Sequence, residues 1–372
     1  MKGIIHFILI STFISGCSRV EQSIPYPTRT ETYFQTIDNE IPLQNTCGAT
    51  KSSPVDQPGI EIYFTNPTDQ VKGNYSSGID NCLVNSINQA MVSIDIATYS
   101  INLWSISNAL IDAYQRGIRV RIVIESDNID DETPQDLRSA GIPIIGDRRE
   151  GLMHNKFMVI DGKEVWTGSA NMTIGSIYYD DNNLVHIISL EIAEDYTTEF
   201  DEMFERDMFG NDVVPKTPHP QVLIGKELVE IYFSPDDHVA SQIITLIDQA
   251  KKSIYFLAYS FTSNDIGTAI IERSNAGILT EGIMDQSQVI SNTGTEYDSF
   301  IKAGIKVYSY AKDGLMHNKV IIIDRKIVIT GSYNFGKNAE ETNDENVVII
   351  HSSMIAEKYL SEYTRIITTM QK

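Results

Sequence analysis

The segment Gly151-Leu152-Met153-His154-Asn155-Lys156 recurs letter for letter as Gly314-Leu315-Met316-His317-Asn318-Lys319. The two copies stay in step at a constant offset of 163 residues, because Gly168-Ser169-Ala170-Asn171 aligns without a gap with Gly331-Ser332-Tyr333-Asn334. One chain therefore carries two copies of the same set of reactive residues.

In each copy a histidine and a lysine stand two residues apart at the head of an apolar run. Side chains of a β-strand alternate between its two faces. Each run therefore predicts a strand that points an imidazole and an ammonium into one space, from His154 and Lys156 or from His317 and Lys319. A surface histidine and lysine beside a core strand would explain either copy alone. The duplication, with Gly-Ser-x-Asn downstream of both, favours a functional site.

The pattern His-x-Lys-x4-Asp followed by Gly-Ser-x-Asn, present twice, resembles the phospholipase D superfamily of phosphodiesterases. Upstream matches extend the likeness to both halves of the chain, such as Glu61-Ile62-Tyr63-Phe64 with Glu230-Ile231-Tyr232-Phe233. The resemblance implies an α/β fold of two similar domains, each a mixed β-sheet flanked by helices. It also implies a pseudo-twofold relation between the domains and one active site at their interface.

The second copy is most similar to the bacterial nuclease and small phospholipase D branch. In that branch a carboxylate 28 residues after the histidine orients its ring, and Glu345 holds this position after His317. The first copy has Asn182 there, beside Asp180 and Asp181. We therefore expect Glu345 to contact His317, and the two histidines to be inequivalent.

Two histidines can divide the chemistry of phosphodiester cleavage. One attacks phosphorus and forms a phosphohistidine, while the other protonates the leaving oxygen and then activates water. A carboxylate favours the charged form of a neighbouring imidazole, so Glu345 predicts His317 as the proton donor and His154 as the nucleophile. The resemblance implies the same order. Participation of Asp180 or Asp181 would restore symmetry and remove the argument from Glu345.

Other motif residues are expected to bind the phosphate or to hold the fold. Lys156 and Lys319 supply positive charge, and polar side chains could donate hydrogen bonds to phosphate oxygens; these are Ser169, Asn171, Ser332 and Asn334. Asp161 and Asp324 stand an odd seven residues after their histidines, so they face away from the rings and are expected to be structural. The resemblance implies that they hold the motif loop. The scheme requires no metal and no cofactor.

The N-terminus resembles a bacterial lipoprotein signal. Lys2 precedes an apolar run from Ile4 to Ile14, which is shorter than the roughly 20 residues that span a bilayer. Cleavage after residue 16 would leave a lipid-bearing Cys17, although an ordinary secretory signal stays open. We expect a location in the bacterial cell envelope, on the outer membrane or facing the periplasm if the host is Gram-negative, or secretion.

The remaining sequence predicts a tether and two domains. Residues 17–58 are rich in Ser, Thr, Pro, Gln and Asn, as tethers are. Alternating strand and helix patterns, with helices predicted at Leu83 to Met91 and Ser105 to Gln115, indicate an α/β fold. The predicted repeats span residues 59–210 and 227–372, joined by a Pro-containing linker at 211–226. Cys47 and Cys82 could form a disulfide in an oxidising compartment, or remain two thiols.

The formal net charge of −21 bears on the substrate. Tight nucleic-acid binders usually present a basic face, which favours phospholipid over DNA or RNA. A local basic cleft is compatible with an acidic chain, because Arg148, Arg149 and Lys312 lie close to the motifs in sequence. The sequence thus predicts hydrolysis of phospholipid head-group diesters. A membrane-tethered endonuclease, a phospholipid transferase or synthase, and a non-catalytic envelope protein are the alternatives; no obligate protein partner is implied.

Overall fold

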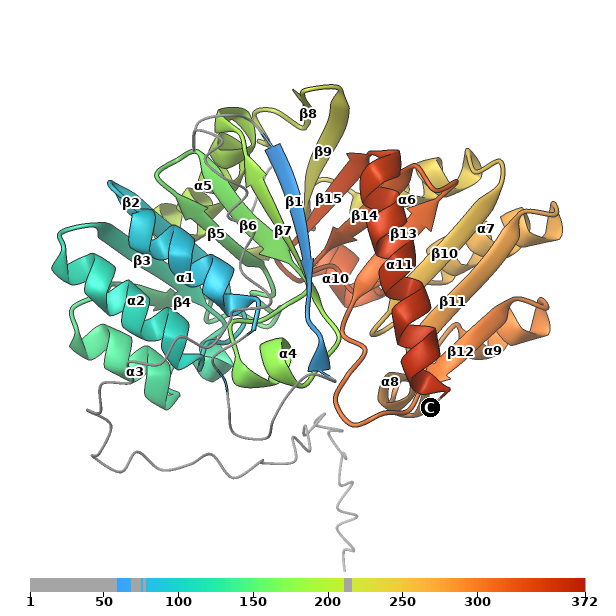
Figure 1. The fold of residues 1–372 in the computed structure, drawn as a ribbon, viewed down its shortest axis with the longest axis horizontal. Helices are drawn as coiled ribbons and strands as arrows, with labels where there is room; N and C mark the ends of the chain where they lie inside the picture. The colour runs from blue at the N-terminus through green and yellow to red at the C-terminus, as the bar shows by residue number, and fades with distance from the viewer. Residues whose placement is uncertain (1–58, 68–74, 76–77, 211–215, 372) are drawn as a thin grey trace, which may run out of the picture. The chain divides into compact units, whose positions relative to one another are not determined.

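The computed structural model describes residues 59–67, 75, 78–210 and 216–371 (Figure 1). The predicted signal peptide (1–16), the tether (17–58), Cys17 and Cys47 lie outside these residues, so lipidation and localisation stay predictions. Cys82 is disulfide-bonded, whereas its predicted pairing with Cys47 also stays a prediction. Within the described part of the chain, none of the helices combines the length and apolar composition needed to cross a bilayer.

The first repeat forms a mixed β-sheet flanked by helices, as predicted. Its strands are β1 (Gly59–Phe64), β2 (Ser93–Thr98), β3 (Arg119–Ile124), β4 (Ile144–Gly146), β5 (Lys156–Ile160), β6 (Glu164–Gly168) and β7 (Asn183–Ile188). Its helices are α1 (Asp80–Gln89), α2 (Trp104–Gln115), the 3-10 turn η2 (Ser126–Asn128), α3 (Glu132–Ser139), α4 (Ile174–Tyr178) and α5 (Leu190–Arg206). The strand order is β1-β7-β6-β5-β2-β3-β4. Parallel pairing joins β2, β3 and β4, and every other neighbouring pair is antiparallel.

The second repeat has the same plan with one added strand. Its strands are β8 (Gln221–Ile224), β9 (Glu227–Ser234), β10 (Ser253–Ala258), β11 (Leu279–Asp285), β12 (Lys306–Tyr310), β13 (Lys319–Ile323), β14 (Ile327–Gly331) and β15 (Glu345–His351). Its helices are α6 (Val239–Asp248), α7 (Asn264–Asn275), α8 (Gln286–Ser291), α9 (Tyr297–Lys302), α10 (Lys337–Glu341) and α11 (Ser353–Met370). The strand order is β12-β11-β10-β13-β14-β15-β9-β8.

The predicted linker was too long at its C-terminal end. Residues 221–224 form β8, which pairs with β9 across a two-residue turn that begins at Gly225 (φ +63°). A positive φ is the backbone conformation that glycine adopts at least cost. The strand is short and directly follows Pro218 and Pro220. Its four-residue pattern was therefore included in the proline-containing linker.

The strands that carry the lysines are buried along their whole length. β5 (KFMVI) and β13 (KVIII) are continuous apolar runs after the lysine, as expected for strands of a sheet covered on both faces. The first sheet packs on one face against α1, α2 and α3, and the second against α6, α7 and α9. A third apolar cluster joins both sheets to α5 and α11.

Aromatic rings in this third cluster connect the two repeats. Tyr196 of α5 lies 5.0 Å from Phe157 of β5 and 5.2 Å from Phe233 of β9, measured between ring centroids. Phe64 of β1 lies 5.0 Å from Tyr359 of α11. Such pairs contribute about 0.5–1.5 kcal/mol each beyond their buried area. The junction between the repeats is thus part of the hydrophobic core.

The two motif aspartates have the structural role that their spacing predicts. Asp161 lies in the tight β5–β6 turn, and its Oδ1 accepts hydrogen bonds from the backbone N–H groups of Val92 (2.7 Å) and Ser93 (3.0 Å). Asp324 does the same for Lys252 (2.6 Å) and Ser253 (3.0 Å). They hold the turns that enter β2 and β10, so the expectation that they hold the motif loop was wrong.

Candidate active site

The two motif segments meet because each pairs with the opposite repeat. The N–H of His154 donates to the carbonyl of Asp344 (3.0 Å), and the N–H of His317 donates to the carbonyl of Asp181 (2.9 Å). Met153 and Met316 form isolated parallel bridges with the same two partners. These reciprocal contacts place one site at the interface of the repeats, as predicted.

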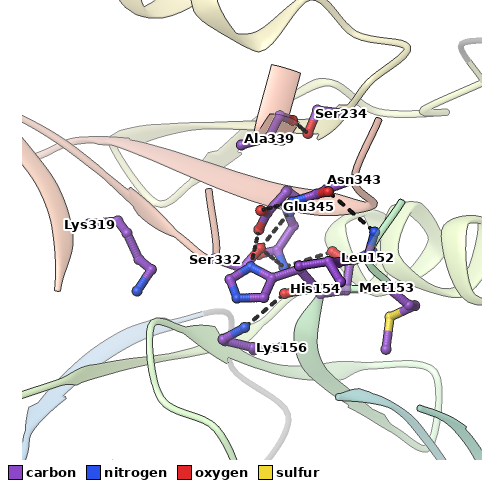
Figure 2. Close-up of polar contacts among 12 residues, drawn as sticks. Leu152, Met153, His154, Lys156, Ser234, Lys319, Ser332, Ala339, Asn343 and Glu345 are labelled. Atoms are coloured by element: carbon purple, nitrogen blue, oxygen red, sulfur yellow. Dashed lines mark hydrogen bonds and ion pairs between the residues drawn. The ribbon is translucent and has the colours of Figure 1, made fainter. Parts of the chain in front are cut away.

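The His154 ring is held by a carboxylate from the second repeat. Its Nδ1 lies 2.7 Å from Oε2 of Glu345, the first residue of β15, and both side chains are buried (Figure 2). The prediction that Glu345 contacts His317 was therefore wrong. The cause is the reciprocal strand pairing: the residue before β15 bonds to the motif segment of the other repeat, so Glu345 reaches that repeat's histidine.

The His317 ring is held by an amide. Its Nδ1 lies 2.9 Å from Oδ1 of Asn182. Neither neighbouring aspartate replaces this contact, because Oδ1 of Asp180 accepts from the N–H of Leu315 (2.8 Å) and Oδ2 of Asp181 accepts from the Tyr310 hydroxyl (2.9 Å). The two histidines are thus inequivalent, as predicted, with the carboxylate on the opposite ring from the one expected.

Burial sets the ionisation of this site. It raises the pKa of Glu345 to about 8, against the opposing effect of Lys156. Burial and the nearby Lys319 and Lys156 ammonium groups lower the pKa of His317 well below its usual range. An amide oxygen can only accept a hydrogen bond, so neutral His317 keeps its proton on Nδ1 and its lone pair on Nε2.

Both lysines belong to this one site. Nζ of Lys156 donates to the carbonyl of His154 (2.9 Å), and Nζ of Lys319 donates to the carbonyl of His317 (2.7 Å). Figure 2 shows the Lys156 ammonium on the side of the His154 ring away from Glu345, and the Lys319 ammonium to one side of the ring. Burial, followed by the charge of Lys156, lowers the pKa of Lys319 well below its usual range. Two buried cations close together are suited to receive an anion.

The motif serines, which were predicted to bind the phosphate or to support the site, contact the partners of the two histidines. Ser169 is fully buried, and its Oγ donates to Oδ1 of Asn182 (2.8 Å). Ser332 is equally buried and hydrogen-bonds Glu345. Each serine therefore supports the acceptor that orients a histidine. The Ser169 side chain faces β7 and the Ser332 side chain faces β15. The spacing of the motif residues does not indicate these directions.

The motif asparagines keep their candidate role. The Oδ1 atoms of Asn171 and Asn334 are buried and accept no hydrogen bond from any residue that the structure describes. Buried polar atoms are nearly always bonded. Two matched exceptions, one in each repeat, mark side chains that are available to a ligand.

The structure adds residues that the sequence argument missed. Asn155, between the histidine and lysine, accepts from Nδ2 of Asn346 (2.9 Å), and Asn318 accepts from Nδ2 of Asn183 (2.7 Å). All four side chains are fully buried. The repeat could have identified these four residues. Asn155 and Asn318 lie inside the repeated hexapeptide, and Asn183 and Asn346 align at the same offset of 163 residues.

Tyrosines and carboxylates around the motifs were also missed. Nζ of Lys156 lies 5.5 Å from the centre of the Tyr99 ring, and Nζ of Lys319 lies 4.8 Å from that of Tyr259. The backbone N–H of Met153 donates to Oε2 of Glu125 (2.9 Å), and that of Met316 donates to Asp285 (3.0 Å). These contacts fix the motif segments at the ends of β3 and β11.

The arginines near the first motif are engaged outside the site. Arg148 pairs with Asp207 at 2.6 Å, and Arg149 donates to the carbonyl of Asp207 at 2.5 Å. Lys312 is exposed. The cations that reach the histidines are therefore Lys156 and Lys319. Among the described residues, no three His, Cys, Asp or Glu side chains are grouped so that they could hold a metal ion.

Two buried histidine–lysine sets, facing each other across two similar α/β sheets, define the phospholipase D class of phosphodiesterase. Comparison with known proteins agrees: residues 83–204 and 243–367 match the family "Cardiolipin synthase, PLD-like domain", which is more than half of the chain. The chain therefore belongs to this family of PLD-like proteins.

Individual relatives show how far the similarity extends. A phospholipase D of Rickettsia bellii is 32% identical over 170 residues, 45% of this chain and 83% of the relative. Cardiolipin synthase A of Proteus mirabilis is 23% identical over 332 residues, 77% of this chain and 68% of the relative. The structure of a phosphatidylserine synthase from Haemophilus influenzae has the same fold, with a TM-score of 0.62 and 14% identity, covering 84% of this chain and 88% of that one.

Proposed function

We propose that this protein hydrolyses the head-group phosphodiester of phospholipids, with His154 as nucleophile and His317 as acid and base. The observation that carries the assignment of roles is the difference between the two ring partners, Glu345 for His154 and Asn182 for His317. The choice of lipid is supported by the phospholipase D relative and by the acidic composition of the chain.

The carboxylate suits the histidine that becomes covalently modified. Attack of Nε2 on phosphorus turns the imidazole into an N-phosphorylated cation whose remaining proton is on Nδ1. Glu345, 2.7 Å from Nδ1, stabilises that cation by a charge-assisted hydrogen bond. An amide stabilises it less, because it carries no charge. The expectation that His154 is the nucleophile thus persists, on a different physical ground from the one the sequence suggested.

The amide suits the histidine that transfers protons. Protonated His317 donates from Nε2 to the oxygen of the leaving alcohol as the P–O bond breaks. Neutral His317 then removes a proton from water, whose oxygen attacks phosphorus and breaks the P–N bond to His154. A lowered pKa makes the protonated ring a stronger acid, and the bound phosphate anion favours its protonation.

The remaining groups hold the phosphate. Lys156 and Lys319 offset the negative charge on the non-bridging oxygens, and Asn171 and Asn334 can donate to them from their amides. The tyrosines under the two ammonium groups restrict the lysines to this space. Phosphatidate and a free head-group alcohol are the products.

Transfer to an alcohol in place of water is the second candidate function. It is favoured by the chain-long similarity to cardiolipin synthase A. The same phosphohistidine would react with a lipid hydroxyl that His317 deprotonates, so the residues and their roles are unchanged. The acceptor that reaches the intermediate decides between the two reactions.

The test compares substrates directly. The purified protein is incubated with phosphatidylcholine vesicles, with the same vesicles plus glycerol, and with supercoiled plasmid, each beside the His154→Ala variant. Head-group release that disappears in the variant supports the proposal, and a glycerol adduct of the lipid supports transfer. Nicking of plasmid without release of choline contradicts the lipid assignment and supports an endonuclease.

A further inference from the structure

The last helix leaves an open groove on the second repeat. The groove lies between α11 and strands β10 and β11 and has a volume of about 350 Å³. It shares no lining residue with the candidate active site. The residues that line it include Tyr255, Glu281, Arg325, Glu357, Tyr363 and Thr364.

The equivalent place in the first repeat is filled by an arginine. Asp95 and Arg121 are register partners on β2 and β3, as Tyr255 and Glu281 are on β10 and β11. The Arg121 guanidinium lies 2.7 Å from Asp95 and 4.8 Å from the centre of the Phe200 ring on α5. It also pairs with Asp201 (3.0 Å) and Glu205 (2.6 Å). The protein therefore places a cation at this point of the fold, between a helix and two strands.

The second repeat has no cation on the equivalent strands, β10 and β11. Glu281 stands where the first repeat has Arg121, and, at the offset of 163 residues, Tyr363 and Thr364 stand where it has Phe200 and Asp201. Two cations lie nearby. Arg325, which lines the groove, pairs with Glu357 at 2.7 Å. Lys306 of β12 is the register partner of Glu281, and its Nζ lies 4.6 Å from the Tyr308 ring centre. Among the described residues, Glu281 forms no ion pair.

Tyr363, which lines the groove, carries an unsatisfied polar atom. Tyr363 is only 4% exposed, and its hydroxyl has no hydrogen-bond partner among the described residues. Its ring lies 5.4 Å from that of Tyr255 at an interplanar angle of 66°. Buried hydroxyls normally have a partner. Two inclined aromatic rings beside a carboxylate are the arrangement that binds organic cations.

We propose that this groove binds an organic cation of the guanidinium or alkylammonium class. The Glu281 carboxylate pairs with its charge, the rings of Tyr255 and Tyr363 contact its face or methyl groups, and the Tyr363 hydroxyl gains a partner. The bound cation takes the place that Arg121 occupies in the first repeat. The site is independent of the phosphodiester chemistry, since it lies outside the histidine site.

The test is isothermal titration calorimetry of the full-length protein. Methylguanidinium and choline are the two ligands, and potassium at equal ionic strength is the reference titration. We expect saturable binding of at least one organic cation at one site, weakened at least tenfold by Glu281→Gln. Thr364→Arg should abolish it, because the new side chain supplies an internal cation. Glu132→Gln, on the exposed helix α3, is the matched charge control and should leave the binding unchanged.

Three results would overturn the site: no saturable binding of either cation, equal binding by the folded Glu281→Gln protein, or equal weakening by Glu132→Gln. Circular dichroism verifies that each variant is folded. Preference for choline identifies an alkylammonium ligand and preference for methylguanidinium a guanidinium ligand. Either preference supports the proposal.

Discussion

The Nδ1 atom of His154 lies 2.7 Å from Oε2 of Glu345, although the two residues belong to different repeats. The matching contact of His317 is made to the amide of Asn182 at 2.9 Å. Each repeat therefore supplies the ring partner of the other repeat's histidine. The two halves of the site differ in this ring partner, a carboxyl group on one side and an amide on the other, and the proposed roles of the two histidines rest on that difference.

Removing the charge of Glu345 should slow formation of the covalent intermediate. Glu345→Gln keeps a hydrogen-bonding side chain at Nδ1 but no longer stabilises the phosphorylated cation. We expect kcat on bis-p-nitrophenyl phosphate to fall by roughly two to four orders of magnitude, the range for acid–base and orienting groups. Stopped-flow release of p-nitrophenolate measures the first step. An unchanged rate would show that Glu345 does not act on the nucleophile.

Adding a charge beside His317 should shift the pH profile. Asn182→Asp places a carboxylate against Nδ1, which favours the protonated ring and raises its pKa. The alkaline limb of kcat/KM, which reports loss of the proton donor, should therefore move to higher pH. Ser169→Ala, which leaves Asn182 in place, is the control and should not move the limb as far. A shift to lower pH would contradict the role of His317.

The motif serines should act on catalysis rather than on substrate affinity. Ser332→Ala removes a hydrogen bond to Glu345 and should lower kcat by roughly 10- to 100-fold, as loss of an outer support typically does, with KM little changed. Asn334→Ala, at a side chain with an unpaired buried oxygen, should instead raise KM. Steady-state kinetics of the two variants separate these effects. The reverse pattern would restore the serine as a phosphate ligand.

Stability should depend on pH through a histidine far from the motifs. Burial lowers the pKa of His186, but hydrogen bonds to Glu164 and Glu61 outweigh it, and the net shift is upward. A raised pKa stabilises the fold below the ordinary histidine value near 6.5, and this contribution is lost as pH rises through the folded-state pKa. Its partner Glu61, whose pKa is lowered to about 2, contributes above pH 4.5 and loses that contribution as pH falls towards 2.

The variant His186→Asn isolates this effect. Losing charge-assisted hydrogen bonds should cost roughly 1–3 kcal/mol of unfolding free energy at pH 5.5 and less at pH 9. Urea titrations at the two pH values give the comparison. A cost that is equal at both values would mean that His186 stabilises the protein by packing on Trp166, from which its ring centroid lies 4.2 Å, and not by its charge.

The sequence predicted the fold and the reactive residues, because both depend on local patterns. Apolar runs such as KFMVI give strands, and the repeated hexapeptide marks the histidines and lysines. The sequence could not predict which histidine Glu345 contacts. That choice depends on pairing between Asp344 and the first motif, a contact between residues 190 positions apart that no local spacing encodes.

The contacts of the motif serines could not be predicted for a related reason. The position of a motif serine in the sequence is the same whether its hydroxyl contacts the phosphate or the amide that orients a histidine. The direction of the Ser169 side chain is decided by β7, where the backbone N–H of Asn183 also donates to its Oγ (3.0 Å). The strand β8 was missed because its four residues follow a proline-containing segment.

The most direct test of the central claim is to locate the covalent phosphate by mass spectrometry. In His317→Ala, bis-p-nitrophenyl phosphate can still phosphorylate His154, because p-nitrophenolate leaves without a proton donor, whereas hydrolysis of the intermediate lacks its base. We predict a burst of about one equivalent of p-nitrophenolate and a p-nitrophenyl phosphate adduct on the peptide that contains His154. An adduct on His317 in the His154→Ala protein, with none on His154 in His317→Ala, would contradict the assignment.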